Sequence, residues 1–597
     1  LSGEKITSDL WVTEVESKRK EFPLNLTGNV AFRTKIHTIV DSLDDGVTDD
    51  RYDFLMNFRG KYKKLGFRSK LSLSSREDKN KQPVNRYNFA LNVPYFEVVG
   101  GDLTPNFGTF TVNGKNIRGI HGKFTVPSFK LITSYGNSYR SINGKAYVDS
   151  TENGQEITNY TNGTFQRKTF AVRTEVGSQS GFLCGLSFSK TKDKLSSLNE
   201  KYYISQTDSF PTVKPKDNLV LALDTRLALL NQRLIFGAEG AMSLYNNNII
   251  GGTMSKDSLE ADIGHSIPFD PETWENIFII NKNVEPIIPN LSNFAYKTYL
   301  RIYLFRNLLN FSYTGIGASF NSLSANYLPI DAKILSIIDN FTLMDNQLAI
   351  NLSFNYISDN LYDEKEVTSE STNYFAQLFY RPPGQPYFGI SYCSNISKNN
   401  YKSEEENGSS YIDRSLDVNS GNFAFSIGYP VNKIVFAPTT FSFNFNTSFN
   451  KDEAAKLFDY KKNYLTLTAK SEFMDLPLYT TLVYSFSIND NINRTYDENT
   501  GFGIDPVKIK SNYNSIYLKG AFSFEEDKLK PYIDFRYSIE GGDVSKTSQM
   551  FNLGSNYNIG RKTFMNAEFG MVFYEDNDIE NSKVSHYNFR FKIKQKF

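Results

Sequence analysis

The end of the chain alternates between apolar and polar side chains over its last strand-length stretch. From Tyr587 onward, four apolar residues share one parity with the terminal aromatic residue: Tyr587, Phe589, Phe591, Ile593 and Phe597. The intervening positions are polar or basic: Asn588, Arg590, Lys592, Lys594 and Lys596. A period of two predicts a β-strand with one apolar and one polar face. The same pattern recurs back to about Leu24, so we predict that nearly the whole chain consists of such strands.

This stretch resembles the closing strand of Gram-negative outer-membrane β-barrels, whose last residue is typically Phe. The resemblance implies an all-β transmembrane barrel in the outer membrane, with apolar faces against membrane lipid and lipopolysaccharide. Mean hydropathy is −0.42, and the absence of any run of about 18 apolar residues excludes a helical membrane protein. Barrel strands need only every second residue apolar, which explains the low value. A large soluble propeller or β-helix is the alternative, but the recurrent glycine or Trp-Asp signatures of those folds are not found.

Connection lengths predict the number of strands. Short connections such as 127–128 and 345–346 alternate with long ones such as 141–163 and 193–217. Barrels of this class have short periplasmic turns and longer external loops. If the chain starts in the periplasm, every long loop must follow an odd-numbered strand. We therefore predict a single antiparallel barrel of about 26 strands, with 24 to 28 acceptable, and with both termini periplasmic.

This count requires that residues 86–126 contribute three strands. We place the two breaks at Val99-Gly100-Gly101 and at Asn113-Gly114. Asn-Gly favours a tight turn, and a glycine pair weakens a strand.

Composition indicates one undivided barrel. No linker divides the chain, so we assign residues 24–597 to the barrel and residues 1–23 to a periplasmic lead-in, which either docks a partner or is loosely attached. The 66 basic and 65 acidic residues give a net charge of +1, which indicates no affinity for nucleic acid. Cys184 and Cys393 lie on predicted strands far apart in order, so a disulfide between them is not expected.

The longest predicted loop, residues 248–294, is unusually apolar. Asp270-Pro271-Glu272 resembles a helix start, after which Trp274, Ile277 and Phe278 would form an apolar side. A loop of this kind either folds into the lumen or over its mouth as a gate or plug, packs on neighbouring loops, or binds a partner.

The sequence carries no recognisable enzyme signature, so we predict no enzyme, no cofactor and no metal centre. The acidic loop after the first strand contains four aspartates that could bind a divalent cation: Asp44, Asp45, Asp49 and Asp50. Their spacing does not match an EF-hand, and a solvated loop is the simpler interpretation. Such a loop could also bridge divalent ions to lipopolysaccharide phosphates.

Polar positions of the strands predict the wall of the lumen. We expect ten residues to face inward: Arg33, Lys35, Tyr299, Arg301, Tyr303, Asp534, Arg536, Arg590, Lys592 and Lys594. Mixed charge with tyrosines indicates a hydrated wall, as any wide barrel requires. It would also suit the passage of a polar polymer. The sequence order shows no stripe of a single charge sign of the kind a simple ion filter needs.

Two internal segments, residues 100–119 (GGDLTPNFGTFTVNGKNIRG) and 319–334 (SFNSLSANYLPIDAKI), are similar to segments of poorly characterised large outer-membrane barrels of Bacteroidota and relatives. The resemblance implies location and fold, and it does not identify a cargo.

Width restricts the function. Barrels of about 16–18 strands already enclose an aqueous channel, so a wider one must be filled or gated by inward-folded loops or by another protein. One hypothesis is a translocon-like or porin-like conduit for a large polar cargo, a polypeptide or polysaccharide, with a lipoprotein or periplasmic plug as partner. The alternative is a non-conducting barrel that anchors surface lipoproteins or an envelope complex.

Overall fold

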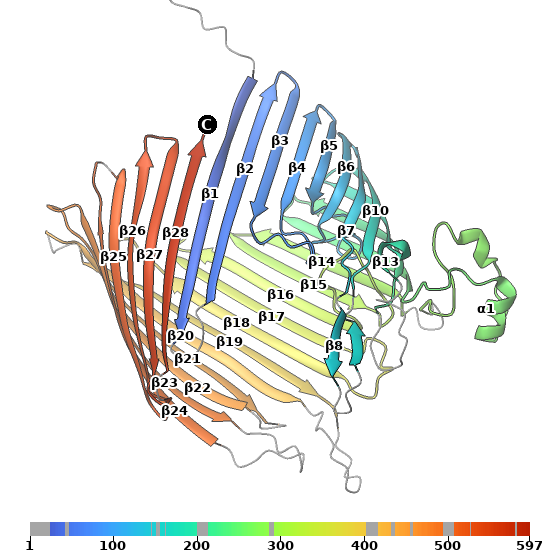
Figure 1. The fold of residues 1–597 in the computed structure, drawn as a ribbon. Helices are drawn as coiled ribbons and strands as arrows, with labels where there is room; N and C mark the ends of the chain where they lie inside the picture. The colour runs from blue at the N-terminus through green and yellow to red at the C-terminus, as the bar shows by residue number, and fades with distance from the viewer. Residues whose placement is uncertain are drawn as a thin grey trace, which may run out of the picture.

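The chain folds into one closed wall of antiparallel strands. The computed structural model describes residues 24–41, 47–144, 146–150, 156–160, 163–199, 213–285, 292–401, 416–431, 436–453, 458–493, 507–525, 527–579 and 582–597. Within them, 26 strands form a single sheet that closes on itself (Figure 1). The predicted all-β barrel and its count of 26 strands are confirmed.

The wall begins with seven consecutive strands and continues after a small separate hairpin. The first seven are β1 (Leu24–Asp41), β2 (Val47–Tyr62), β3 (Leu65–Ser74), β4 (Arg86–Val93), β5 (Phe96–Leu103), β6 (Ile117–Val126) and β7 (Phe129–Tyr139). The hairpin consists of β8 (Ala146–Ser150) and β9 (Glu156–Tyr160). Because β7 pairs with β10, this hairpin stands outside the wall order.

The remaining strands follow each other around the wall. The middle group is β10 (Gln166–Gly177), β11 (Phe182–Lys194), β12 (Asp217–Leu229), β13 (Leu234–Asn246), β14 (Phe294–Leu304), β15 (Asn307–Ile316), β16 (Ala332–Leu343), β17 (Leu348–Asp359), β18 (Ser369–Tyr380) and β19 (Tyr387–Asn399). The last group is β20 (Asp417–Val431), β21 (Thr439–Asp452), β22 (Phe458–Glu472), β23 (Leu478–Asn493), β24 (Val507–Phe522), β25 (Leu529–Gly542), β26 (Lys546–Ile559), β27 (Thr563–Asp576) and β28 (Lys583–Lys596). Helical turns are confined to connections: η1 (Leu195–Ser197), α1 (Lys256–Ile263) and η3 (Pro271–Trp274). No helix in the described ranges is long and apolar enough to cross a membrane.

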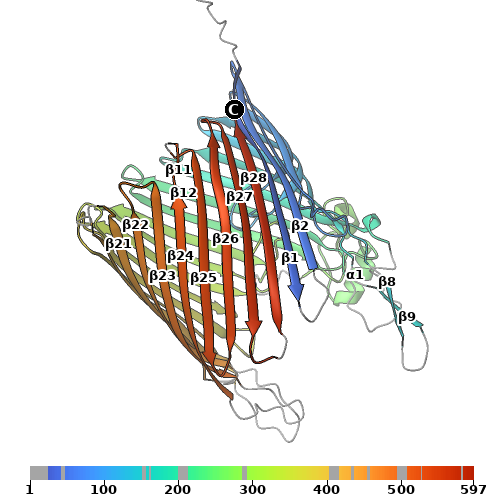
Figure 2. The ribbon, with the colours of Figure 1, turned by 60° about the vertical axis from the view of Figure 1, so that its left-hand side comes forward.

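The two ends of the chain close the barrel. β1 pairs with β28 from Asn29 opposite Lys596 to Asp41 opposite Val584 (Figure 2). Beyond the last pair, Gly28 and Phe597 exchange backbone hydrogen bonds of 3.2 Å. This pairing removes both free sheet edges, as a membrane-spanning sheet requires.

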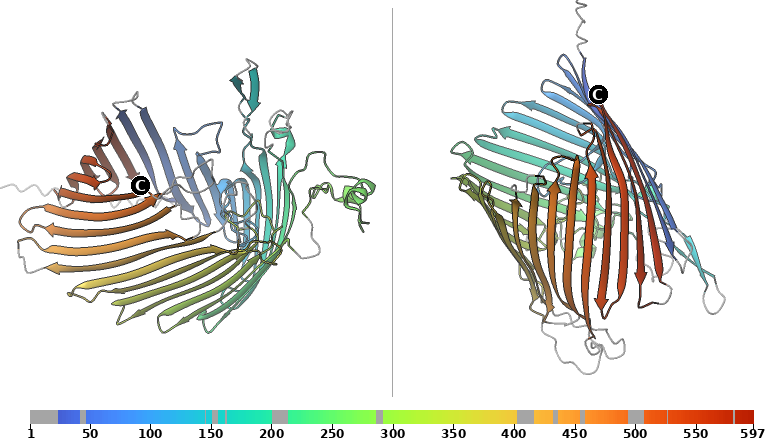
Figure 3. Two further views of the ribbon diagram at one scale, coloured as in Figure 1. Left: turned by 90° about the horizontal axis from the view of Figure 1, so that it is seen from below. Right: turned by 90° about the vertical axis from the view of Figure 1, so that its left-hand side faces the viewer.

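Connection lengths differ between the two rims of the barrel. Short turns such as 63–64 and 305–306 lie on the rim that carries the start of β1 and the end of β28 (Figure 3). Long connections such as 104–116 and 247–293 arise at the opposite rim. We call the first rim the terminal rim. Its periplasmic orientation stays a prediction.

The three strands predicted between residues 86 and 126 are present, but their boundaries differ. The turn between β4 and β5 is at Pro94-Tyr95, and Gly100-Gly101 lies inside β5. Gly101 has a φ of +106°, and a Cβ there would meet the Tyr87 carbonyl oxygen at 2.2 Å. The glycine therefore permits a close backbone approach within the sheet and does not end the strand. Asn113-Gly114 lies in the long β5–β6 connection and forms no tight turn between strands.

Candidate functional site in the barrel lumen

The inward and outward faces of the wall differ in what covers them. Leu221 and Leu223 on β12 are 43% and 53% exposed, as expected of residues that face lipid. Their neighbours Val220 and Ala222 are 0% and 2% exposed because chain on the inside of the barrel packs over them. Alternation along each strand and the pairing register carry this assignment around the wall.

Two connections fold back onto the inward face and form what we call the inner layer: residues 104–116 between β5 and β6, and residues 317–331 between β15 and β16. Phe110 and Phe320 meet edge to face, with ring centroids 5.7 Å apart. They pack with a set of mostly small wall residues: Val220, Ala222, Ala241, Ala295 and Ile316. The small side chains on β12–β14 leave the volume that the two rings fill.

Wall side chains hold residues 104–116 by hydrogen bonds. Arg173 Nη1 and Ser187 Oγ donate to the Phe107 carbonyl oxygen at 2.8 and 2.6 Å. Glu239 Oε1 accepts from the Phe110 amide at 3.2 Å. Arg173 is fixed in turn by Asp224 and Glu175, with nitrogen–oxygen distances of 2.5 and 2.8 Å. A buried ion cluster thus anchors this part of the inner layer.

Residues 317–331 are tied to the wall and to the other half of the inner layer. Asn218 Nδ2 donates to the Asn321 carbonyl at 2.9 Å, and its Oδ1 accepts from the Leu323 amide at 3.0 Å. Between the two connections, the Asn113 amide donates to Ser324 O at 3.1 Å, and the Asn326 amide donates to Asn113 O at 2.9 Å. The two segments whose resemblance to known barrels was noted from sequence are therefore in contact.

The described part of the apolar insertion, residues 248–294, lies outside the wall. It does not fold into the lumen, which was one of the alternatives from sequence. Asp217, whose neighbour Asn218 faces the inner layer, points outward and accepts a hydrogen bond from the Ile279 amide at 3.0 Å. Lys190 pairs with Asp217 and lies 4.8 Å from the centre of the Phe278 ring. α1 projects away from the barrel (Figure 1).

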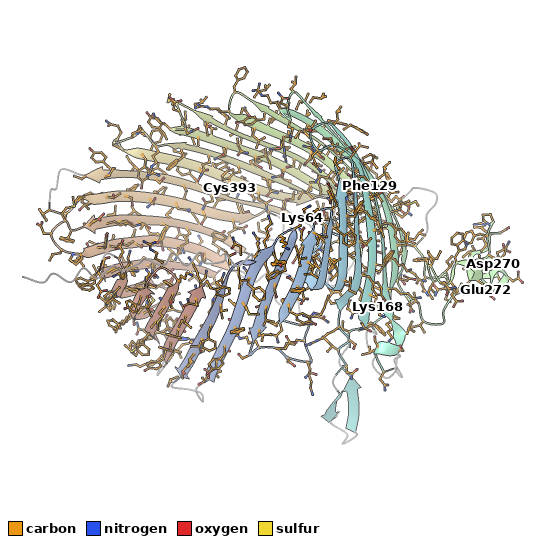
Figure 4. The ribbon with its side chains drawn as sticks, turned by 90° about the horizontal axis from the view of Figure 1, so that it is seen from above. Lys64, Phe129, Lys168, Asp270, Glu272 and Cys393 are labelled. Atoms are coloured by element: carbon orange, nitrogen blue, oxygen red, sulfur yellow. The ribbon has the colours of Figure 1, made fainter. Side chains whose placement is uncertain are left out.

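The three proposed gate residues of this insertion differ in how far they are buried. Phe278 is buried against the outer end of β11, whereas Trp274 and Ile277 are 48% and 47% exposed. Asp270 and Glu272 lie beyond the ring of strands (Figure 4). These residues cannot narrow the lumen from that position. Ile250 of the insertion packs against Leu198 of the β11–β12 connection, as the alternative of packing on neighbouring loops expects. A partner site stays a prediction for the exposed residues.

The register places the ten predicted lumen residues on the inward face. On β14, Tyr299, Arg301 and Tyr303 share the parity of Ala295, which packs on the inner layer. Arg301 Nε donates to Asn310 Oδ1 at 2.9 Å. Asp534 on β25, which shares its inward parity with Arg536, accepts from Asn552 at 2.8 Å. Arg590 pairs with Glu568 at 3.2 Å.

Closure of the barrel creates a charge pattern that sequence order concealed. Arg33 on β1 lies directly opposite Lys592 on β28, and Lys35 lies opposite both Arg590 and, on β2, Arg51. Inward-facing residues of β2 and β3 extend this basic sector: Arg59, Lys61, Arg68 and Lys70. Carboxylates interrupt this sector, because Asp53 on β2 lies directly opposite Arg33 and pairs with Arg51, and Glu568 pairs with Arg590. The sector is therefore rich in basic side chains without being a stripe of a single charge sign, which agrees with the expectation from sequence. The basic residues were present in each strand, but the first and last strands become neighbours only on closure.

The wall opposite this basic sector is uncharged. The strands from β15 to β21 are fully described, and their register assigns which positions face inward. Every inward-facing position between the strand ends is neutral. Serine and asparagine dominate it, for example Asn351, Ser353 and Asn373. The lumen thus combines a basic sector, a neutral hydroxyl and amide sector, and the inner layer.

The predicted cation loop receives no further support. Asp44 and Asp45 lie outside the described residues. Asp49 pairs with Arg76, and Asp50 accepts a hydrogen bond from the Tyr52 hydroxyl at 3.4 Å. No group of three or more His, Cys, Asp or Glu side chains in the described ranges could hold a metal ion.

A closed wall with an apolar exterior and a polar interior is the structure that a β-sheet needs in order to span a membrane. The chain is an outer-membrane β-barrel. No protein-family model matches it, and no curated protein matches it.

Solved structures similar to it are also barrels. The P pilus usher PapC translocation pore aligns over 95% of this chain and 99% of its own at 9% identity, with a TM-score of 0.28. Acinetobacter baumannii OccAB2 aligns over 96% and 98% at 8% identity and a TM-score of 0.29. The copper transporter OprC aligns over 96% and 81% at 9% identity and a TM-score of 0.29. With scores this low, the assignment rests on the wall itself.

Proposed function

We propose that the barrel is a gated conduit for a large polar cargo, such as a polypeptide or a polysaccharide, and that the inner layer is its gate. The observation that carries the proposal is the division of the inward face. One side is covered by the inner layer, while the strands from β17 to β21 present bare serine and asparagine side chains. A non-conducting scaffold has no need of such a wetted wall.

The inner layer suits a gate because its attachments are unlike those of the wall. It consists of two connections without regular secondary structure, held by side-chain packing, by hydrogen bonds and by the Arg173 ion cluster. Such contacts can be exchanged without breaking strand pairs, so the wall stays closed while the layer moves. A lipoprotein or periplasmic plug remains part of the proposal as the trigger for that movement.

Single-channel recording in a planar bilayer tests the proposal on the purified barrel together with any co-purifying protein. Replacing both rings of the aromatic pair, Phe110→Ala with Phe320→Ala, should loosen the inner layer and raise the open probability severalfold. Phe375→Ala is the matched control, because this exposed aromatic on the inward face of β18 lies outside the inner layer.

Each outcome is decisive for the proposal. A large current that increases in the double variant and not in the control supports a conduit gated by the inner layer. A barrel that stays silent in the wild type and in the double variant contradicts the conduit and favours the anchoring barrel.

A further inference from the structure

A basic pocket lies on the inward side of β2–β5 at the terminal rim. Its volume is about 580 Å³. Five cationic side chains line it: Arg59, Lys61, Lys63, Lys64 and Arg68. Glu97 is the one carboxylate in the same lining. Lys64 lies at the tip of the β2–β3 hairpin on this rim (Figure 4).

Four of the five cations of this pocket form no ion pair with the described residues. Arg59 lies directly opposite Arg68 on the neighbouring strand, an arrangement that opposes pairing of the two strands. Glu97 is engaged by Arg68, at 2.5 Å between Nη2 and Oε1. The ion pairs of the described residues give Arg59, Lys61 and Lys64 no carboxylate. The cluster therefore carries an excess of positive charge in a concave site.

We infer that this pocket binds a small polyanionic group, with two or more phosphates or carboxylates. A volume of several hundred cubic ångströms is that of a small-molecule site. Two guanidinium groups on adjacent strands offer planar donor pairs that match phosphate or carboxylate oxygens. Three lysines at the mouth add point charges that attract an anion from solution. An anion between Arg59 and Arg68 also removes their mutual repulsion.

Adjacent cavities extend the site along the wall. A pocket of about 260 Å³ shares Asn92 and Glu97 with it and adds Lys123. A smaller one of about 130 Å³ shares Arg68 and Glu97 and reaches Phe107 of the inner layer. The polyanion site thus lies at the terminal-rim end of a groove, and the other end of that groove reaches the proposed gate. Its ligand is either a free small anion or the anionic end of a longer cargo.

The inference goes beyond the proposed conduit and does not depend on it, because a barrel that conducts nothing can still bind the anion. Isothermal titration of the detergent-solubilised full chain with tripolyphosphate is the test. The triple variant Arg59→Gln, Lys61→Gln, Lys64→Gln should weaken binding at least tenfold. All three side chains are exposed, so the wall should fold normally, which heat-dependent gel mobility verifies.

The matched control removes three cations from other turns of the same rim: Lys528→Gln, Arg561→Gln and Lys562→Gln. It should bind tripolyphosphate as the wild type does. Absence of wild-type binding, or equal loss in both triple variants, would overturn the inference.

A second titration uses long-chain polyphosphate and distinguishes the two sources of the ligand. Equal affinity per chain indicates a site for a free small anion. Markedly tighter binding of the polymer that is lost in the pocket variant indicates a site for the end of an anionic cargo. Binding of the polymer that survives in the pocket variant contradicts the assignment to this pocket.

Discussion

Individual side chains decide how the inner layer is held. Arg173 is buried and joins two carboxylates of the wall to the backbone of Phe107. Removing one member of a buried ion cluster leaves the others charged and unpaired, which costs more than the lost contact itself. The strongest effects of single substitutions are therefore expected at this cluster and not at the exposed charges of the lumen.

Replacing Arg173 with methionine should destabilise the barrel by about 3–5 kcal/mol, because Asp224 and Glu175 lose their shared cation. Urea unfolding in micelles, followed by far-ultraviolet circular dichroism and gel mobility, measures the change. Arg301→Met is the control, since Arg301 is exposed and donates to a single asparagine. A loss below about 1 kcal/mol for Arg173→Met would show that the cluster does not anchor the layer.

Glu77 should make the β3–β4 connection sensitive to acid. The amides of Asn85 and Val84 donate to its carboxylate, and Arg140 pairs with it, which together lower the pKa of Glu77 below its ordinary value of 4.5. Because the folded pKa is depressed, the contribution to stability is complete above the ordinary pKa and is lost as pH falls through the folded one.

Hydrogen exchange of residues 75–85 measures this effect. Exchange should be slow at pH 7 and should accelerate, beyond the intrinsic pH trend, as the pH falls below the ordinary pKa of 4.5 and through the lower folded pKa. Glu77→Gln should show the faster exchange already at pH 7, while Glu366→Gln in the β17–β18 connection should leave residues 75–85 unchanged. Identical exchange of wild type and Glu77→Gln at pH 7 would contradict the assignment.

At the level of elements, two connections that are about 200 residues apart behave as one unit. Asn113 and Ala325 form an isolated β-bridge between them. Directly opposed residues of a bridge are about 5 Å apart at Cα, which is within the range of a disulfide. The inner layer can therefore be locked covalently without strain in the wall.

The pair Asn113→Cys and Ala325→Cys, in a chain whose Cys184 and Cys393 are replaced by serine, should form a disulfide under mild oxidation. The pair Asn113→Cys and Ala424→Cys should not, because β20 lies on the uncovered wall. Mobility on a non-reducing gel after protease cleavage between the two positions reports the link. Failure of the first pair to link, or linking of the control, would refute the inner layer as described.

On the scale of the whole molecule, the closing strand pair places like charges directly opposite each other, as the β1–β2 and β2–β3 pairs also do. Arg33 and Lys592 are directly opposed, as are Lys35 and Arg590. Like charges in that position destabilise a strand pair, whereas opposite charges contribute about 0.2–1 kcal/mol. The barrel keeps directly opposed like charges at its closing strand pair and on the strands that border the basic pocket.

Lys592→Glu should therefore raise the stability of the barrel by roughly 1 kcal/mol, since it places a carboxylate opposite Arg33. The temperature at which gel mobility changes from folded to unfolded measures it, at low and at high salt. Lys594→Glu is the control, because its partner on β1 is Ala31. A lower transition temperature for Lys592→Glu than for the control would mean that the basic sector stabilises the closure in another way.

Local pattern determined the strands, their facing and their number. A period of two is a property of neighbouring residues, so Tyr587 to Phe597, Arg301 and Asp534 could be assigned to faces without knowledge of their partners. Connection length and parity then led to 26 strands even though two breaks were misplaced. Gly100-Gly101 and Asn113-Gly114 were misread because a glycine or Asn-Gly permits several conformations, and the contact that selects one is non-local.

Tertiary structure alone decided what fills the lumen and what charge it presents. Phe110 and Phe320 meet because small residues on β12–β14 leave room for them, which brings together three segments that are far apart in the chain. The apolar insertion stays outside because Asp217 and Lys190 bind it on the outward face. Arg33 and Lys592 become neighbours only when the first strand pairs with the last, and no local pattern within either strand records that closure.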